Sequence, residues 1–481
     1  MKKDTIIYGI AIVFERAISF FTLPILTKEL PVELYGVWSQ IIVTMGLLIP
    51  IVLLGFQTAI VNFFAGNEAD SNEKRNIFIV MSCIVIINLF AIVACTNLFS
   101  PLISRFIFGD PVFAGYVPIF GYLLSTEALF ELLVGYLRSG QKIKLLAVYY
   151  VIKSILRIGV LALGLMIFDL SLYAVLTSLI LLHIIFIVVI YVKDVLARSN
   201  LDFNMAYWRS RSRELLIFGL PLVPLSILSW GNNFVDRYLI LNFLNIKQVA
   251  IYAVAYSIAA IVALFYSILG FTLYPKIAQL WNEGQKIQVA ALLQKGVGYY
   301  LFFLIPSIAT LTIMNKSIID IFSTTEYSSS YMVIFFLSAG IGLFGLYQIY
   351  FYVTLLASRT VLNLLVMTVS VLANVMFNYV LIPRVGIIGA ALATALSNGI
   401  LALWTMELGK KAIPIVFPWS DAGRIVLATG VMSLFLLVAR HSIAVYSVWT
   451  LATVGAAAGV LYLTMDVVHK NSIVRRLKAN I

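Results

Sequence analysis

Long apolar stretches run through the whole chain, and short polar stretches separate them. A helix of about 20 residues, rising about 1.5 Å per residue, crosses the hydrocarbon core of a bilayer. By this measure the chain contains about fourteen predicted membrane-spanning helices. They lie near residues 5 to 28, 36 to 64, 76 to 99, 112 to 137, 143 to 167, 171 to 192, 214 to 240, 247 to 274, 293 to 314, 328 to 352, 357 to 382, 386 to 408, 422 to 440 and 444 to 466.

The apolar pattern restarts near the middle of the chain, in a span that contains Pro221 and Pro224. Membrane helices tolerate such prolines because neighbouring helices satisfy the freed carbonyl groups. An apolar run that ends in LGF at 54–56 returns as one that ends in LGF at 269–271. Similarly, AVLTSLI at 174–180 corresponds to ALATALS at 391–397. A constant offset of roughly 215 residues predicts two repeats of about six spans each.

We therefore predict an all-α integral membrane protein, with two pseudo-symmetric six-helix lobes and two extra C-terminal helices. Residues 1–213 would form the N-terminal lobe with a basic cytoplasmic linker. Residues 214–409 would form the C-terminal lobe, and residues 410–481 two peripheral spans and a basic tail.

Composition supports this class. Of the 481 residues, 62% are hydrophobic and only 11% are charged, and the mean hydropathy is +1.03. A soluble chain of this length needs far more charge to cover its surface. Cys83 and Cys95 lie in one apolar span and read as core residues, not as a disulfide or metal pair. No cleavage site follows the first residues, MKKDT, so the first span is expected to be permanent.

The net charge of +12 is mainly a signal of orientation. With both termini in the cytoplasm, inside segments hold 23 of the 33 lysines and arginines and outside segments hold 6. This asymmetry predicts an even number of spans with both ends inside. The cluster WRSRSRE at 208–214 would contact anionic lipid headgroups. No soluble basic domain is present, so no nucleic-acid partner is expected.

Four cations fall inside predicted spans, namely Arg16, Lys153, Arg157 and Arg237. An ionised group at the bilayer centre costs about 2.5 to 3.5 kcal/mol on insertion scales, so each needs a partner or a watery cavity. Arg237 lies near the outer interface, where it would pair with the adjacent Asp236, extend to the headgroups or bind substrate. Arg16 lies near the middle of its span, and its neighbour Glu15 points about 100° away on the helix.

Lys153 and Arg157 stack one turn apart on the fifth span, and Glu127 and Glu131 stack likewise on the fourth. Antiparallel packing would place Glu127 at the depth of Lys153, so an ion pair is expected there. Arg157 lies a turn farther out than any depth-matched carboxylate. Arg16 and Arg157 are therefore the stronger candidates for binding an anion. Whether the Glu127–Lys153 pair is structural or functional stays open.

The repeat offset sets Lys153 and Arg157 against a polar stripe on the eleventh span, formed by Ser370, Asn374 and Asn378. A cavity between cations and amides would suit an anionic headgroup that carries hydroxyl-rich groups. Alternatively, such residues only hold helices together. His183, alone in an apolar span, is expected to be a satisfied helix-contact residue.

Three stretches resemble the polysaccharide flippases (O-antigen or Wzx type) of the multidrug/oligosaccharidyl-lipid/polysaccharide exporter superfamily. They are ERAISFFTLPILTKELPVELYGVW at 15–38, FGLPLVPLSILSWGNNFVDRYLI at 218–240 and LANVMFNYVLIPRVGIIGAALATALSN at 372–398. The resemblance implies a non-enzymatic flippase that moves an undecaprenyl-pyrophosphate-linked oligosaccharide across a bacterial inner membrane by alternating access. The Asp236–Arg237 pair matches the family pattern. The expected partners are the lipid-linked oligosaccharide, membrane lipids and other polysaccharide-assembly membrane proteins.

No resident cofactor or metal is expected. Glu127, Glu131, Asp236 or His183 could bind a coupling proton or sodium ion. A flippase for a peptidoglycan precursor is the nearest alternative, since it differs only in the headgroup. A multidrug exporter would be expected to have twelve spans and an acidic cavity. A membrane enzyme acting on the same lipid carrier would need a large external loop or an acidic metal motif, and neither is seen in the sequence.

Overall fold

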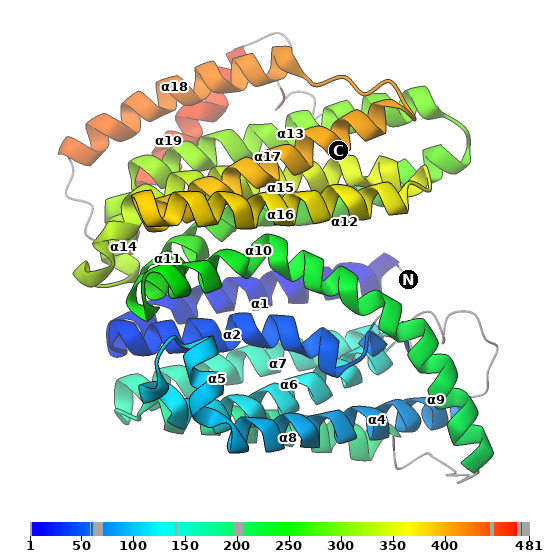
Figure 1. The fold of residues 1–481 in the computed structure, drawn as a ribbon. Coiled ribbons are helices and arrows are strands. Elements are labelled where there is room, and N and C mark those ends of the chain that lie inside the picture. Colours follow the sequence, from blue (N-terminus) through cyan, green and yellow to red (C-terminus); the bar gives the residue numbers. More distant parts are fainter. Residues whose placement is uncertain are drawn as a thin grey trace. The chain divides into compact units, whose positions relative to one another are not determined.

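Helices make up nearly all of the part of the chain that the computed structural model describes (Figure 1). The described residues are 2–57, 59–60, 71–139, 142–195, 205–442, 447–468 and 473. No strand occurs among them. The prediction of an all-α membrane protein is confirmed.

The contacts divide the chain into two compact units. Unit 1 comprises Met1–Phe234 and Asn245–Ala250, and unit 2 comprises Val235–Leu244 and Ile251–Ile481. The predicted lobe boundaries at 213 and 409 stay predictions. The helices that begin in unit 1 are α1 (Lys2–Glu29), α2 (Val32–Val52), α4 (Ser71–Leu98), α5 (Ser100–Ile107), η1 (Pro111–Gly115), α6 (Tyr116–Ser139), α7 (Ile143–Ala162), η2 (Leu163–Ile167), α8 (Leu172–Ile190), η3 (Tyr191–Val195), α9 (Met205–Gly219), η5 (Leu220–Leu222), α10 (Val223–Phe243) and α11 (Ile246–Ala259).

Unit 2 takes in the ends of α10 and α11 and all later helices. These are η6 (Ala260–Val262), α12 (Ala263–Asn282), α13 (Lys286–Ile313), α14 (Asn315–Phe322), η7 (Thr325–Ser330), α15 (Tyr331–Leu356), α16 (Thr360–Val385), α17 (Ile387–Lys410), α18 (Trp419–Ser442) and α19 (Val448–Val468).

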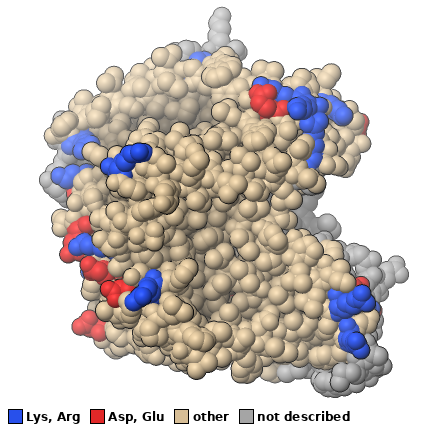
Figure 2. All heavy atoms as spheres, viewed as in Figure 1, with Lys and Arg blue, Asp and Glu red and all other residues tan. Residues whose placement is uncertain are grey.

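Most of these helices are long and apolar enough to cross a membrane. Within the described residues, thirteen helical segments meet this condition, and they correspond to the second to fourteenth predicted spans. The first predicted span lies within α1. On the face that Figure 2 shows, charged side chains gather near the helix ends and the region between them is almost free of charge. This distribution is the one that a bilayer requires.

An internal repeat is visible in two short amphipathic helices. In unit 1, α4 is followed by the eight-residue α5, a 3-10 turn and α6. In unit 2, α13 is followed by the eight-residue α14, a 3-10 turn and α15. The starts of the short helices, Ser100 and Asn315, are 215 residues apart. The structure thus repeats the same motif at the offset found in the sequence.

A sharp turn after α2 packs against the break between α9 and α10. Gly55 has φ +73°, and a Cβ placed on it would lie 2.2 Å from the carbonyl oxygen of Gly219. Only glycine fits this approach. A few turns further on, the indole nitrogen of Trp230 donates a hydrogen bond to the carbonyl oxygen of Val43, at 2.8 Å. The beginning of the predicted seventh span is therefore attached to unit 1.

The polar segment before this break is itself helical. Arg211 on α9 forms ion pairs with Glu73 on α4, at 2.6 Å, and with Glu214, at 2.8 Å. The lipid-contacting cluster that the sequence suggested thus includes an arginine that ties two helices of unit 1 together.

The two C-terminal helices pack within unit 2. Helix α18 contacts α13 and α19. The hydroxyl of Tyr462 on α19 donates a hydrogen bond to the carbonyl oxygen of Phe302 on α13, at 2.9 Å, and the two rings lie 5.0 Å apart. These contacts fix the extra helices to one helix of the second repeat.

Candidate functional site

A buried ion pair joins two helices of unit 1. The amine of Lys153 on α7 donates hydrogen bonds to both carboxylate oxygens of Glu127 on α6, at 2.8 and 3.0 Å. The side chain of Lys153 is 9% exposed and that of Glu127 is 19% exposed. Depth matching along the two helices predicted this pair, and the prediction is confirmed. Both charges are mostly shielded from solvent, so each depends on the other.

A third helix, α8, contributes a side chain to this ion pair. His183 on α8 places Nδ1 3.2 Å from Glu127 and 3.5 Å from the hydroxyl of Thr126. The ring of Phe130 stacks near the imidazole, with ring centres 6.4 Å apart, and lies 3.8 Å from the Lys153 amine. His183 therefore has partners, as expected for a helix-contact residue. Its membership in the Glu127 cluster is new information from the structure.

Glu131 extends the cluster by one helical turn. It accepts a hydrogen bond from the side-chain amide of Gln57, at 3.3 Å. Its carboxyl group lies close enough to Glu127 and to Glu15 on α1 for their charges to interact. Three acidic side chains from two helices thus share one region with Lys153.

Arg157 is half-buried one turn from Lys153 on α7, and its charge reaches Glu127. Helix α7 packs against α1, the helix that carries Arg16. The side chain of Arg16 lies outside the described residues. The cations of α7 therefore belong to a mixed cluster with Glu127, rather than to a purely positive wall.

Unit 2 holds a second buried polar cluster, centred on Asp236. The hydroxyl of Tyr252 on α11 donates a short hydrogen bond to this carboxylate, and the hydroxyl of Thr394 on α17 donates another at 3.3 Å. The backbone NH of Arg237 donates a third, at 2.8 Å. Asp236 is 2% exposed. Its side chain thus links three helices in a region without bulk water.

Arg237 also contacts an aromatic ring. Its guanidinium carbon lies 4.7 Å from the centre of the Tyr256 ring, the distance of a cation–π contact. The residue is 6% exposed. The sequence expectation that Arg237 extends to the headgroups does not fit this burial.

The predicted polar stripe of α16 faces α17. Ser370 donates to the carbonyl oxygen of Ser397 at 3.1 Å, and the amide of Asn374 donates to the Ser397 hydroxyl at 2.9 Å. Asn378 donates to the Asn374 side chain at 2.9 Å. All four residues are at most 1% exposed. In this conformation the stripe holds two helices together, and a substrate contact for Asn374 and Asn378 stays a prediction.

Several members of these clusters were not singled out from the sequence. Tyr252, Thr394 and Gln57 look like ordinary residues of apolar spans. Their roles depend on which face of the helix meets a neighbour. The one available signal was that Thr394 lies in a stretch matched by the repeat. No group of three or more His, Cys, Asp or Glu side chains suited to a metal occurs within the described residues.

The helices, their repeat and their buried charges define a multi-pass membrane protein of a transporter fold. The fold is similar to that of a lipid II flippase, MurJ, solved in an inward closed conformation. The TM-score is 0.77 at 17% identity, over 96% of this chain and 98% of that one. An inward-facing multidrug resistance transporter of the MATE family, in the MOP superfamily, matches with a TM-score of 0.67 at 14% identity, over 82% and 94%.

The sequence gives the family. The profile described as "Polysaccharide biosynthesis protein" matches residues 1–281, and the chain belongs to that family. The "Probable low-salt glycan biosynthesis flippase Agl15" of Haloferax volcanii is 23% identical over 46% of this chain and 47% of its own. The "Capsular polysaccharide biosynthesis protein CapF" of Staphylococcus aureus is 23% identical over 39% and 48%. The matches span about half the length of these relatives. The resemblance noted from the sequence is thereby confirmed.

Proposed function

We propose that the protein is a flippase that moves an undecaprenyl-pyrophosphate-linked oligosaccharide, such as an O-antigen or a related polysaccharide repeat unit, from the cytoplasmic to the periplasmic leaflet. The observation that carries the proposal is the pair of cations on one face of α7, Lys153 and Arg157, inside a membrane span of a polysaccharide biosynthesis protein. Charged groups in spans are costly and are retained where they serve a function.

The two cations would act on the pyrophosphate. Arg157 is the residue that we assign to first contact, because it is half-buried and its planar group suits bidentate phosphate binding. Arg16 would approach from α1. Lys153 already contacts Glu127, so it would have to be shared between the carboxylate and the phosphate. The pyrophosphate would stay hydrated in a polar cavity, while the prenyl chain remains in lipid.

This sharing suggests how transport is driven. When Lys153 binds the phosphate instead of Glu127, the neighbours of the Glu127 carboxylate are His183 and Glu131. A buried carboxylate that loses its cation binds a proton rather than stay charged. Substrate binding at α7 would therefore be linked to proton uptake at α6. Asp236 and its partner oxygens in unit 2 offer a second place for a coupling proton or sodium ion. Alternating access of the two lobes would complete the cycle.

The proposed setting is the bacterial cytoplasmic (inner) membrane, with both termini in the cytoplasm and other polysaccharide-assembly membrane proteins nearby. The excess of lysine and arginine in one set of loops supports this orientation. A second candidate function is the flipping of a peptidoglycan precursor, which the fold shared with MurJ favours. The two candidates share the lipid pyrophosphate and differ in the sugar.

Reconstitution tests the proposal. Purified protein in vesicles would be given lipid-linked oligosaccharide or peptidoglycan precursor in one leaflet, and arrival in the other leaflet would be scored with an external sugar-cleaving enzyme. We expect transport of the oligosaccharide. Arg157→Ala should reduce it at least tenfold, because charge-assisted bonds are among the strongest. Arg105→Ala, which removes an exposed arginine on α5, is the control. Equal transport by Arg157→Ala and Arg105→Ala would remove Arg157 from the site.

A further inference from the structure

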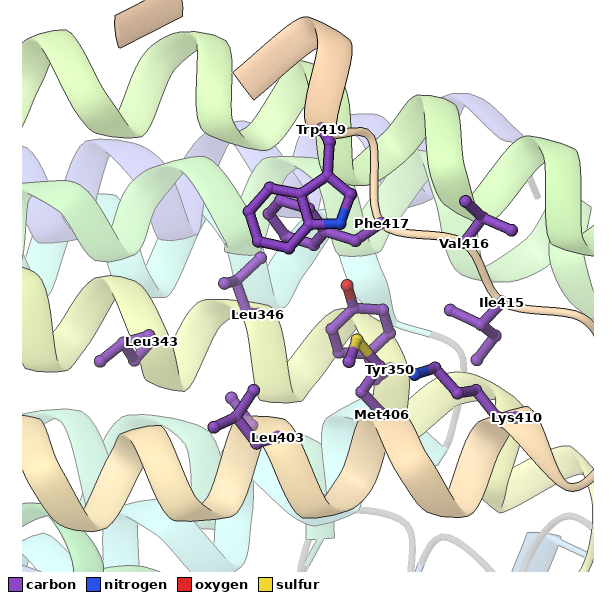
Figure 3. A pocket seen from close by; sticks show the side chains of 11 residues that line it. Leu343, Leu346, Tyr350, Leu403, Met406, Lys410, Ile415, Val416, Phe417 and Trp419 are labelled. Carbon is purple, nitrogen blue, oxygen red and sulfur yellow. The ribbon is translucent and has the colours of Figure 1, made fainter. Parts of the chain in front are cut away.

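Unit 2 contains an apolar pocket of about 490 Å³ between α15, α17 and the segment that connects α17 to α18 (Figure 3). Its walls are formed mainly by aliphatic and aromatic side chains. Those that matter here are Leu343, Leu346, Leu403, Met406, Ile415 and Phe417. Such a wall suits a hydrocarbon chain.

Two polar groups reach this apolar space. Tyr350 is 3% exposed, and its hydroxyl oxygen is buried with no hydrogen-bond partner among the described residues. Lys410 at the end of α17 lines the same pocket. Figure 3 shows the Lys410 side chain extending toward Tyr350, whose hydroxyl points toward Phe417 and Trp419. A buried hydroxyl without a partner is costly, so the oxygen of a ligand is expected there.

The surroundings place the pocket at a membrane surface. Trp419 is 76% exposed at the start of α18, and exposed tryptophans concentrate at the level of lipid headgroups. Its ring packs on that of Phe417, with ring centres 4.6 Å apart, and a movement of these two rings would give a ligand access to the Tyr350 hydroxyl. Lys410 bonds Glu407 at 2.6 Å, but both side chains are exposed, at 41% and 59%. Exposed pairs are weak, so the ammonium group can also serve a phosphate.

We infer that this pocket binds one anionic phospholipid, with an acyl chain in the apolar space, an ester carbonyl on the Tyr350 hydroxyl and the phosphate at Lys410. The volume of about 490 Å³ lies within the range of small-ligand pockets, about 300 to 1,000 Å³, and suits a single hydrocarbon chain. Lys411, adjacent and exposed, adds to the attraction for a negative headgroup. The inference does not depend on the proposed transport.

Native mass spectrometry of the delipidated full chain tests the inference. The probes are phosphatidylglycerol, phosphatidylcholine and undecaprenyl phosphate at equal concentrations. We expect one phosphatidylglycerol per chain, bound roughly tenfold more tightly than phosphatidylcholine. Tyr350→Phe should weaken both phospholipids about three- to tenfold, and Lys410→Gln should remove the preference between them. Leu403→Trp, at a position 63% exposed, should fill the pocket and abolish binding without disturbing the fold.

Tyr347→Phe on the same helix and Lys316→Gln, at an exposed lysine of α14 that does not line the pocket, are the controls, and neither should change binding more than twofold. Circular dichroism checks that every variant keeps its helices. Wild-type affinity in the Leu403→Trp variant, or equal binding of the two phospholipids, would overturn the inference. Displacement of phosphatidylglycerol by an equal amount of undecaprenyl phosphate would also overturn it, because the pocket would then belong to the carrier lipid.

Discussion

Variants of the Glu127–Lys153 pair allow its contribution to the stability of the protein to be measured separately from its contribution to transport. Lys153→Met removes the ammonium group and leaves the carboxylate with His183, at 3.2 Å, and with the more distant charge of Arg157. Breaking a buried ion pair costs about 3 to 5 kcal/mol. Glu127 is 19% exposed, so partial solvation places the expected loss near the lower end, at about 3 kcal/mol. Glu127→Gln should cost a similar amount, because Lys153 is the more deeply buried partner.

The double variant Glu127→Gln/Lys153→Met is the informative one. With neither charge present, we expect most of the stability to return, so that the two losses fail to add by at least 2 kcal/mol, within the range of measured couplings. Unfolding in detergent micelles, followed by circular dichroism, measures all four proteins. Transport should stay abolished in the double variant, since the phosphate has lost Lys153. If the stability losses of the two single variants add in the double variant, the pairing is refuted. If the double variant transports normally, the pair has a structural role only.

Three further outcomes follow from the packing. Gly55→Ala should destabilise the protein by about 1 to 3 kcal/mol, because the new Cβ would sit on a left-handed backbone and clash with Gly219. Thermal unfolding in detergent measures the loss, and an unchanged unfolding midpoint would contradict the close approach of the two glycines. Asp236→Asn should lower stability by about 1 to 3 kcal/mol through weaker bonds to Tyr252; the same assay applies, and a neutral result would mean that the carboxyl group is not needed in charged form. Tyr462→Phe should cost about 1 kcal/mol and increase hydrogen exchange in α19, whereas unchanged exchange would show that the two C-terminal helices are held by other contacts.

Hydropathy predicted the spans well because a bilayer demands length and apolarity, and both are visible in the sequence. The repeat offset of roughly 215 residues reappears in α5 and α14. The extent of spans at polar boundaries was harder to predict. Residues from Met205 onward read as a polar linker, whereas they form α9, because ion pairs of Arg211 stabilise a helix that hydropathy does not reveal.

The candidate site was predictable in depth but not in rotation. Counting residues along two antiparallel helices is enough to match Glu127 with Lys153. It does not show which side of α8 meets them, so His183 could not be placed beside Glu127. The stripe of α16 illustrates the same limit, since a polar face that lines a cavity and one that meets another helix have the same spacing.

The attachment of the early seventh span to unit 1 has a consequence for biosynthesis. Membrane proteins are inserted from the N-terminus onward, and the turn at Gly55 has no partner until Gly219 has been made. Similarly, the carbonyl oxygen of Val43 cannot accept its hydrogen bond from Trp230 until Trp230 has been made. The first repeat therefore cannot reach its final packing when its own six spans are complete; it closes only once part of the second has entered the membrane. Two fragments divided at residue 213 should assemble less well than two fragments divided in a later loop.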